Sequence, residues 1–135
     1  MATINATVSI NSDISSYPVN INNSMTMFKA GTCHGLEETT GLRTKKIVAT
    51  GTDVVIVEQD ELVNNGAHKV YIRNTTSNKE FYISVTQTEE IGRLYGGDWM
   101  LFPTNGDVDI SVTSAGTNMV IEYMVFADGI ETTKG

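Results

Sequence analysis

The stretch KVYIRNTTSNKEFYISVT, residues 69–86, decides the fold class of this chain. In its second half Phe81, Ile83 and Val85 alternate with more polar residues, and a period of two is typical of a half-buried β-strand. Its first half, 69–74, has the same strand-forming composition. The segment 75–78 between them contains only residues that favour turns. Because so short a polar link is typical of a hairpin, we expect these two strands to pair antiparallel.

Strand-like segments continue on both sides of this stretch. They alternate or form short apolar runs, and turns rich in Asn, Gly and Ser separate them, such as Asn64–Gly66 and Asn105-Gly106. They are residues 2–10, the segment around Val19 and Ile21, 47–49, 53–58, 98–103, 107–113 and 119–126. The pattern predicts an all-β fold with little or no helix. We expect an antiparallel β-sandwich, either jelly-roll or immunoglobulin-like, with about nine or ten short strands.

Length and charge limit the number of domains and the kinds of partner that this chain can have. Its 135 residues suffice for a single sandwich domain over 1–135, with 127–135 as a flexible tail. A formal net charge of −7 disfavours nucleic acid and anionic membranes as partners. No apolar run approaches the ~18 residues that span a bilayer, and the N-terminus lacks the pattern of a signal peptide. We therefore expect a soluble protein made in the cytoplasm, without a nucleic-acid or membrane partner.

Residues with reactive or metal-binding side chains are few. Cys33 is the single cysteine, and on an extended segment its neighbour His34 would point to the opposite side, which argues against a thiol–imidazole pair. Cys33, His34 and His68 fall short of the four ligands of a zinc site. Asp107 and Asp109 lack a matching loop of calcium ligands. We expect no enzymatic activity, no metal site and no cofactor.

Aromatic residues bear on possible sugar binding. Trp99 lies within an apolar run and is predicted to belong to the core. Tyr71 and Tyr82 have the opposite parity from the apolar residues beside them. Each tyrosine is therefore either half-buried in a sheet or turned outward to solvent, where it could contact a sugar.

Residues 1–28 form the first candidate contact surface. Asp13 is the sole charged residue in this segment. The segment is either an ordinary hairpin at the edge of a sheet or an N-terminal arm that reaches a neighbouring subunit, because it lacks the charges that usually protect an exposed edge. The contact residues of such an arm would be those of its polar face: Thr3, Asn5, Thr7 and Ser9.

Residues 29–46 form the second candidate contact surface. Their glycines interrupt any regular pattern and predict a long connection. Four of the nine Lys and Arg residues lie in this segment. The segment is either a solvated loop or a basic contact spot on an acidic molecule, in which case Arg43, Lys45 and Lys46 would make the contact.

The second half of the chain resembles a known family. The matching segments are KVYIRNTT (69–76), EFYISV (80–85), IGRL (91–94), GDWMLFP (97–103) and MVIEYMVF (119–126). They are similar to segments of small structural proteins of marine tailed phages, especially the short-tailed phages of cyanobacteria. The resemblance covers residues 69–126 and contains no catalytic signature.

This resemblance implies a function, a partner and a location. It implies a virion protein of the capsid decoration or cement type, which binds the outer surface of the phage head and stabilises the shell. The implied partner is the major capsid protein or another virion protein, with many copies per particle or a homo-oligomer. The alternative is a carbohydrate- or receptor-binding β-domain of a tail or head fibre, which predicts exposed aromatic side chains.

Overall fold

The structure is a computed structural model that describes residues 3–13, 19–36, 38–51, 53–76, 79–86 and 89–129. Across these ranges it contains eleven strands and one short 3-10 helix, η1. Their bounds are β1 Asn5–Ser12, β2 Val19–Thr26, β3 Glu38–Thr39, β4 Arg43–Ile47, β5 Asp53–Val57, η1 Gln59–Glu61, β6 His68–Asn74, β7 Phe81–Val85, β8 Glu89–Leu94, β9 Trp99–Thr104, β10 Ile110–Ser114 and β11 Met119–Ala127. The predicted all-β, antiparallel fold is confirmed, with more strands than the nine or ten expected.

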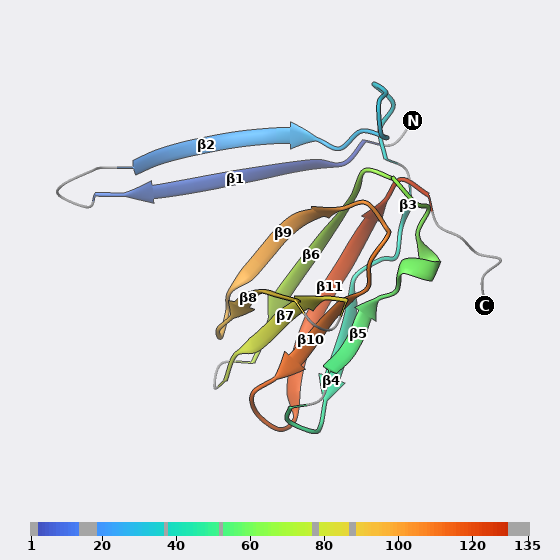
Figure 1. Ribbon diagram of the computed structural model, residues 1–135. Helices are drawn as coiled ribbons and strands as arrows, with labels where there is room; N and C mark the ends of the chain where they lie inside the picture. Colours follow the sequence, from blue (N-terminus) through green and yellow to red (C-terminus); the bar gives the residue numbers. More distant parts are fainter. Residues whose placement is uncertain are drawn as a thin grey trace.

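Strands β4 to β11 pair in a nested order. β4 pairs with β11, β5 with β10, β6 with β9 and β7 with β8, all antiparallel. Two further pairings, β6 with β11 and β7 with β10, join these pairs into the sheets β4-β11-β6-β9 and β5-β10-β7-β8, and β3 continues along the edge of β11 (Figure 1). This nesting in two packed sheets is the jelly-roll topology, which decides between the two sandwich types predicted.

The pairing predicted within residues 69–86 is wrong. β6 and β7 lie in different sheets, so the link between them crosses from one sheet to the other instead of closing a hairpin. The side chain of Asn74, fully buried at the end of β6, donates its amide hydrogens to the backbone oxygens of Lys79 and Leu94, each at 2.9 Å. These bonds fix the crossing because a buried amide must find its partners within the fold. Residues 77 and 78 of the predicted turn lie outside the described residues.

The core fills the space between the two sheets. Buried and half-buried positions alternate along the whole of β11, as expected for a strand with one face on a core. Ile72 of β6 and Phe81 and Ile83 of β7 are 0% exposed and belong to one apolar cluster. The inward face predicted for β7 is therefore confirmed, although its last member, Val85, is only partly buried against the cluster.

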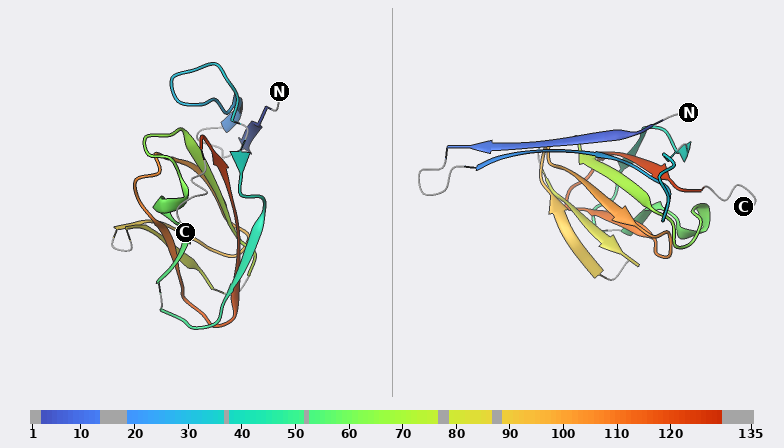
Figure 2. Two further views of the ribbon diagram at one scale, coloured as in Figure 1. Left: turned by 90° about the vertical axis from the view of Figure 1, so that its right-hand side faces the viewer. Right: turned by 90° about the horizontal axis from the view of Figure 1, so that it is seen from above.

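Strands β1 and β2 form a separate two-stranded sheet. Their register runs from Asn5 opposite Thr26 to Ser12 opposite Val19. The hairpin extends past the sandwich to one side (Figure 2). Within the described residues neither strand pairs with a strand of the jelly roll, so the hairpin is a sheet of its own, and an arm that reaches a neighbouring subunit stays a prediction.

The base of this hairpin is tied to the sandwich through Asp128. Its Oδ2 accepts hydrogen bonds from the backbone N–H groups of Ala30 and Ala67, both at 2.9 Å. The backbone N–H of Asp128 donates to Nδ1 of the buried His68 at 2.9 Å, so Nε2 carries the ring proton and donates to the oxygen of Val63 at 2.8 Å. One carboxylate thus links the segment after the hairpin to the segment before β6.

The predicted flexible tail, 127–135, begins too early. Ala127 is the last residue of β11 and is 1% exposed. Val63 donates its backbone N–H to the oxygen of Gly129 at 3.0 Å. These contacts, together with those of Asp128, keep residues 127–129 in the fold, and residues 130–135 lie outside the described part of the chain.

Candidate interaction surface

The outer face of β9 carries Trp99, which corrects the prediction that this residue belongs to the core. Its side chain is 53% exposed. Trp99 pairs with the exposed Arg73 of β6. Met100 and Phe102 lie on the opposite face of β9 and pack against the core. Both faces of β9 are apolar, and a period of two then does not reveal which face is covered.

An open hollow of about 490 Å³ lies beside Trp99. Its lining residues are Tyr71, Arg73, Gly97 and Trp99. The Tyr71 hydroxyl donates to Oε1 of Glu122 at 3.0 Å. Partial burial, the bond to Glu122 and the charge of that carboxylate raise the pKa of Tyr71 above its ordinary 10.0, against the opposing influence of Arg73. The hollow therefore places aromatic surface beside polar groups, an arrangement that can stack on a ring and hydrogen-bond its substituents.

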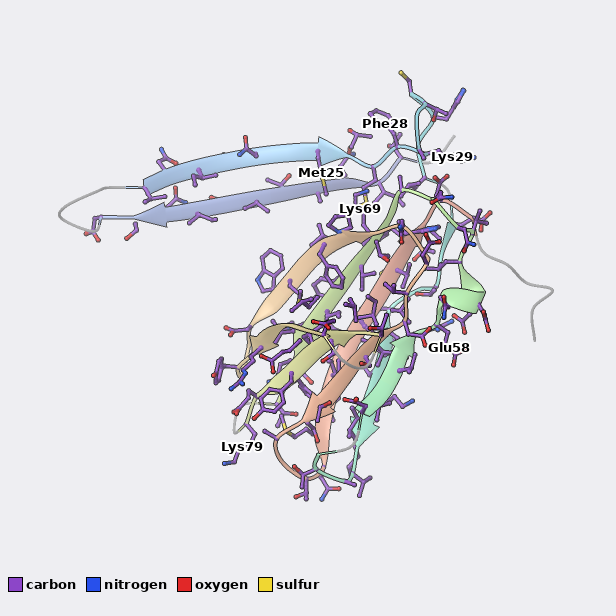
Figure 3. The ribbon with its side chains drawn as sticks, in the orientation of Figure 1. Met25, Phe28, Lys29, Glu58, Lys69 and Lys79 are labelled. Atoms are coloured by element: carbon purple, nitrogen blue, oxygen red, sulfur yellow. The ribbon has the colours of Figure 1, made fainter. Side chains whose placement is uncertain are left out.

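A groove separates the hairpin from the same outer face of the sheet. One part, about 240 Å³, lies between Ala6 and Val8 on the hairpin and Trp99, Leu101 and Phe126 on the sheet. A second part, about 140 Å³, lies beside Met25, which points from β2 toward the sandwich (Figure 3). The apolar face of the hairpin base thus faces this sheet across an open groove.

The apolar face of the hairpin continues beyond the sandwich. Ala6, Val8 and Ile10 share one side of β1, and Ile10 stands opposite Ile21 of β2. Ile10 is 51% exposed and Ile21 is 42% exposed. The alternation that predicts a half-buried strand is therefore present, but the outer part of the strand has no covering surface within the described chain. We call this face, made of Ala6, Val8, Ile10, Ile21 and Met25, the underside of the hairpin; Ala6, Val8 and Met25 lie at its base, and Ile10 and Ile21 lie beyond it.

The opposite face of the hairpin is polar and uncharged. The predicted contact residues Thr3, Asn5, Thr7 and Ser9 are all exposed. Two of them bond to β2: Asn5 Oδ1 accepts from Thr26 Oγ1 at 2.8 Å, and the Thr7 and Ser24 hydroxyls lie 3.0 Å apart. The structure therefore brings these residues together on one surface, and their role in contacts stays a prediction.

The basic residues of the second candidate surface lie on a strand instead of a loop. Arg43, Lys45 and Lys46 belong to β4, an edge strand that pairs with the first half of β11. All three are exposed, but successive side chains on a strand point to opposite faces, so Lys46 is turned away from Arg43 and Lys45. β4 and the hairpin lie at different ends of the molecule (Figure 1). The two predicted contact sets therefore do not form one surface.

The remaining residues singled out by the sequence lie apart from this surface. Tyr82 on β7 is half-buried, and the Arg93 guanidinium covers its ring at 4.4 Å. Cys33 and His34 are exposed in the loop that follows the hairpin. In the ranges that the structure describes, no group of three or more His, Cys, Asp or Glu side chains could hold a metal ion. Nor does any described helix have the length and apolar character to cross a membrane.

Sequence reasoning found the polar face of the hairpin and missed the apolar residues that adjoin the groove. The missed residues are Ile10, Ile21, Trp99 and Leu101. One signal for them exists in the sequence: β1, β2 and β9 contain no charged residue, although the chain has 16 Asp and Glu and nine Lys and Arg. Comparisons with protein-family models, curated proteins and solved structures find no match for this chain.

Proposed function

We propose that this protein is a phage virion structural protein of the capsid decoration or cement type. It binds the major capsid protein, or another virion protein, on the outer surface of the head and stabilises the shell in many copies per particle. The observation that carries the proposal is the projecting, uncharged hairpin. A protein that builds instead of catalysing needs a stable fold and a surface that another protein can cover.

The polar face of the hairpin supports this role physically. Hydroxyl and amide side chains lose less on leaving water than charged groups do, provided that they keep hydrogen bonds. Asn5 and Thr7 are already held by cross-strand bonds, so less side-chain freedom is lost when a partner covers them. On a shell that repeats one site many times, neighbouring copies can add avidity to a modest single contact.

The fold supports the proposal less specifically. Jelly rolls occur both in viral capsid proteins and in lectins, and a fold alone does not determine a function. The similarity of residues 69–126 to phage structural proteins favours the first of these classes. The net charge of −7 suits a protein that stays dispersed at high concentration until it meets its shell.

Binding to particles tests the proposal. Purified protein is added to heads of a phage from which its gene has been deleted, and bound copies are counted after sedimentation. We expect saturable binding, at least a tenfold weaker affinity for Thr7→Glu, and unchanged affinity for Thr117→Glu, an exposed control in the turn before β11. Wild-type protein that fails to bind heads at any concentration would contradict the proposal, as would equal binding by both variants.

A second candidate function is binding of carbohydrate or a receptor, as a domain of a tail or head fibre. The exposed Trp99 beside Tyr71 and Arg73 favours it, because a glycan-binding surface needs an accessible aromatic ring. A glycan array probed with wild-type protein and Trp99→Ala tests this function. It requires a glycan signal that the substitution removes; no signal at high protein concentration would count against it.

A further inference from the structure

We propose that the hollow beside Trp99 binds an acidic saccharide, meaning a sugar ring that carries a carboxylate or a sulfate group. Trp99 provides the surface on which the ring stacks, and Arg73 provides the cation that pairs with the acidic group. This inference rests on the second candidate function, glycan binding, and names the class of glycan. It does not require attachment to a head shell.

The outer face of the sheet β4-β11-β6-β9 has an excess of positive charge. Successive side chains on a strand alternate between faces, so the strand pairings assign the charged residues of this face. Over these four strands, all within the described ranges, they are Lys46, Lys69, Arg73 and Glu122. These cations outnumber the carboxylate on a molecule whose formal net charge is −7. The face therefore attracts an anion locally, whereas the molecule as a whole repels one.

Arg73 is the cation of this face that lines the hollow. Its side chain is exposed, and within the part of the chain that the structure describes it forms no ion pair. Lys69, by contrast, donates its Nζ to the backbone oxygen of Ala67 at 3.1 Å. A guanidinium presents its donors in a planar fork that matches paired anionic oxygens. Arg73 thus keeps a charge that no described carboxylate neutralises by direct contact.

Trp99 and Arg73 stand directly opposite one another on neighbouring strands. Side chains at such positions have Cβ atoms about 4.5–5.5 Å apart, so a ring that lies on the indole has its substituents within reach of the guanidinium. The Trp99 side chain is 53% exposed, and the apolar C–H face of a sugar ring can cover such an aromatic surface. The pair therefore offers stacking and charge to one and the same ring.

Tyr71 and Glu122 supply acceptors for the hydroxyl groups of the sugar. Tyr71 donates its own hydroxyl hydrogen to Oε1 of Glu122 at 3.0 Å, which leaves the phenolic oxygen as an acceptor. In the strand order Arg73 stands between Trp99 and Glu122, because it pairs with both. The acidic group of a ring on Trp99 thus meets the cation before it meets the carboxylate.

The hollow is already formed in the protein alone. Backbone bonds fix its wall: Gly97 donates to the Asn74 oxygen at 2.9 Å, and Asn74 donates to the Asp98 oxygen at 3.0 Å. Its volume of about 490 Å³ lies within the range of about 300–1,000 Å³ that is typical of small-molecule sites. Tyr71 and Trp99 also line the adjoining groove, so a second sugar unit has room beside the first. Little new order is therefore required when the ligand binds.

The same features disfavour a nucleic acid, which also combines rings with negative charge. A single strand requires cations that follow its phosphates over several nucleotides. The described residues that line the adjoining groove are uncharged, and the net charge of −7 opposes a long polyanion. One ring with one acidic group fits Arg73 better than a chain of phosphates does.

Isothermal titration calorimetry with matched sugars tests the inference. The probes are disaccharides of glucose, galactose and mannose, each as the neutral sugar, as the uronic acid oxidised at one primary hydroxyl, and as the sulfate ester at that hydroxyl. We expect at least one acidic form to bind about tenfold more tightly than its neutral parent. Its binding should also change the emission of Trp99, the single tryptophan of the chain. The tighter of the two acidic forms identifies the group that pairs with Arg73.

Two variants and one control assign the binding to the hollow. Arg73→Gln should weaken binding of the acidic sugar about tenfold and remove its advantage over the neutral parent. Trp99→Ala should weaken binding of both forms about tenfold. Arg43→Gln removes the same charge from the opposite face of the same sheet and should leave the affinity unchanged. Urea unfolding verifies that each variant is folded.

Several results would overturn the inference. They are equal binding of acidic and neutral sugars, no binding of any sugar, wild-type affinity of Arg73→Gln for the acidic sugar, and tighter binding of a single-stranded oligonucleotide than of every acidic sugar. Equal binding would leave glycan binding itself as a function. Copies bound to phage heads are counted for the same proteins. Sugar binding without head binding would refute the capsid role alone, whereas head binding without sugar binding would refute this inference and leave the capsid role intact.

Discussion

Replacing Asp128 by alanine should loosen the attachment of the hairpin to the sandwich. One carboxylate oxygen accepts both the Ala30 and the Ala67 backbone N–H groups, and a hydrogen bond to a charged group contributes roughly 1.5–3 kcal/mol. The Ala30 N–H is exposed and regains a water partner, whereas the partly buried Ala67 N–H is left with a poorer one. We therefore expect Asp128→Ala to lower the free energy of unfolding by about 1–3 kcal/mol.

The same contact should depend on pH. Burial acts to raise the pKa of Asp128, but the two backbone donors and the nearby Lys29 outweigh it and hold the pKa below its ordinary 3.8. A carboxyl group with a lowered folded pKa stabilises the fold above its unfolded pKa, and this contribution disappears as the pH falls through the folded pKa. The stability difference between wild type and Asp128→Ala should be complete at neutral pH and shrink below about pH 4.

Urea unfolding at neutral pH and at about pH 3 measures both effects, with amide hydrogen exchange at Ala30 and Ala67 as a local probe. Asp60→Ala removes the same charge from an exposed position on η1 and serves as the control. The control should retain wild-type exchange at both amides. If Asp128→Ala keeps the wild-type free energy of unfolding and the wild-type exchange at Ala67, the reasoning about this carboxylate is refuted.

Two further predictions concern packing and backbone conformation. Phe81→Ala, at a fully buried position, should lower the free energy of unfolding by about 3–5 kcal/mol, and Trp99→Ala, at a half-exposed position, should lower it by less than about 1 kcal/mol. Equal losses in urea unfolding would contradict the placement of Trp99 outside the core. Gly106→Ala should cost about 2–4 kcal/mol, because φ is 87° and the new Cβ would lie 2.6 Å from the Val63 oxygen. Gly97→Ala, with φ of 85° and open space around it, should lower the free energy of unfolding by only about 1 kcal/mol. Thermal unfolding measures both variants, and equal destabilisation would show that the contact between the new Cβ at position 106 and the Val63 oxygen does not matter.

Strand existence could be predicted from the sequence, but strand pairing could not. Alternation identifies which residues of 69–74 and 81–85 face a core, and those faces are the same whether the two strands form a hairpin or lie in opposite sheets. The composition of the link is equally ambiguous, since both kinds of connection are polar. The crossing depends on Asn74, whose buried amide finds acceptors at Lys79 and at Leu94, a partner too distant in the sequence to be recognised there.

The contact surface was missed for a related reason. Alternation along β1 shows that one face is apolar, but it does not show that the groove beside the sheet reaches Val8 and leaves Ile10 half exposed beyond it. In β9 both faces are apolar, and only the nested pairing decides that Trp99 points outward. The apolar face of β1 and the outer face of β9 are neighbours in the fold, although their residues lie far apart in the sequence. Neither strand contains a charged residue, so both exposed faces lack the side chains whose burial costs most, a property that alternation alone does not reveal.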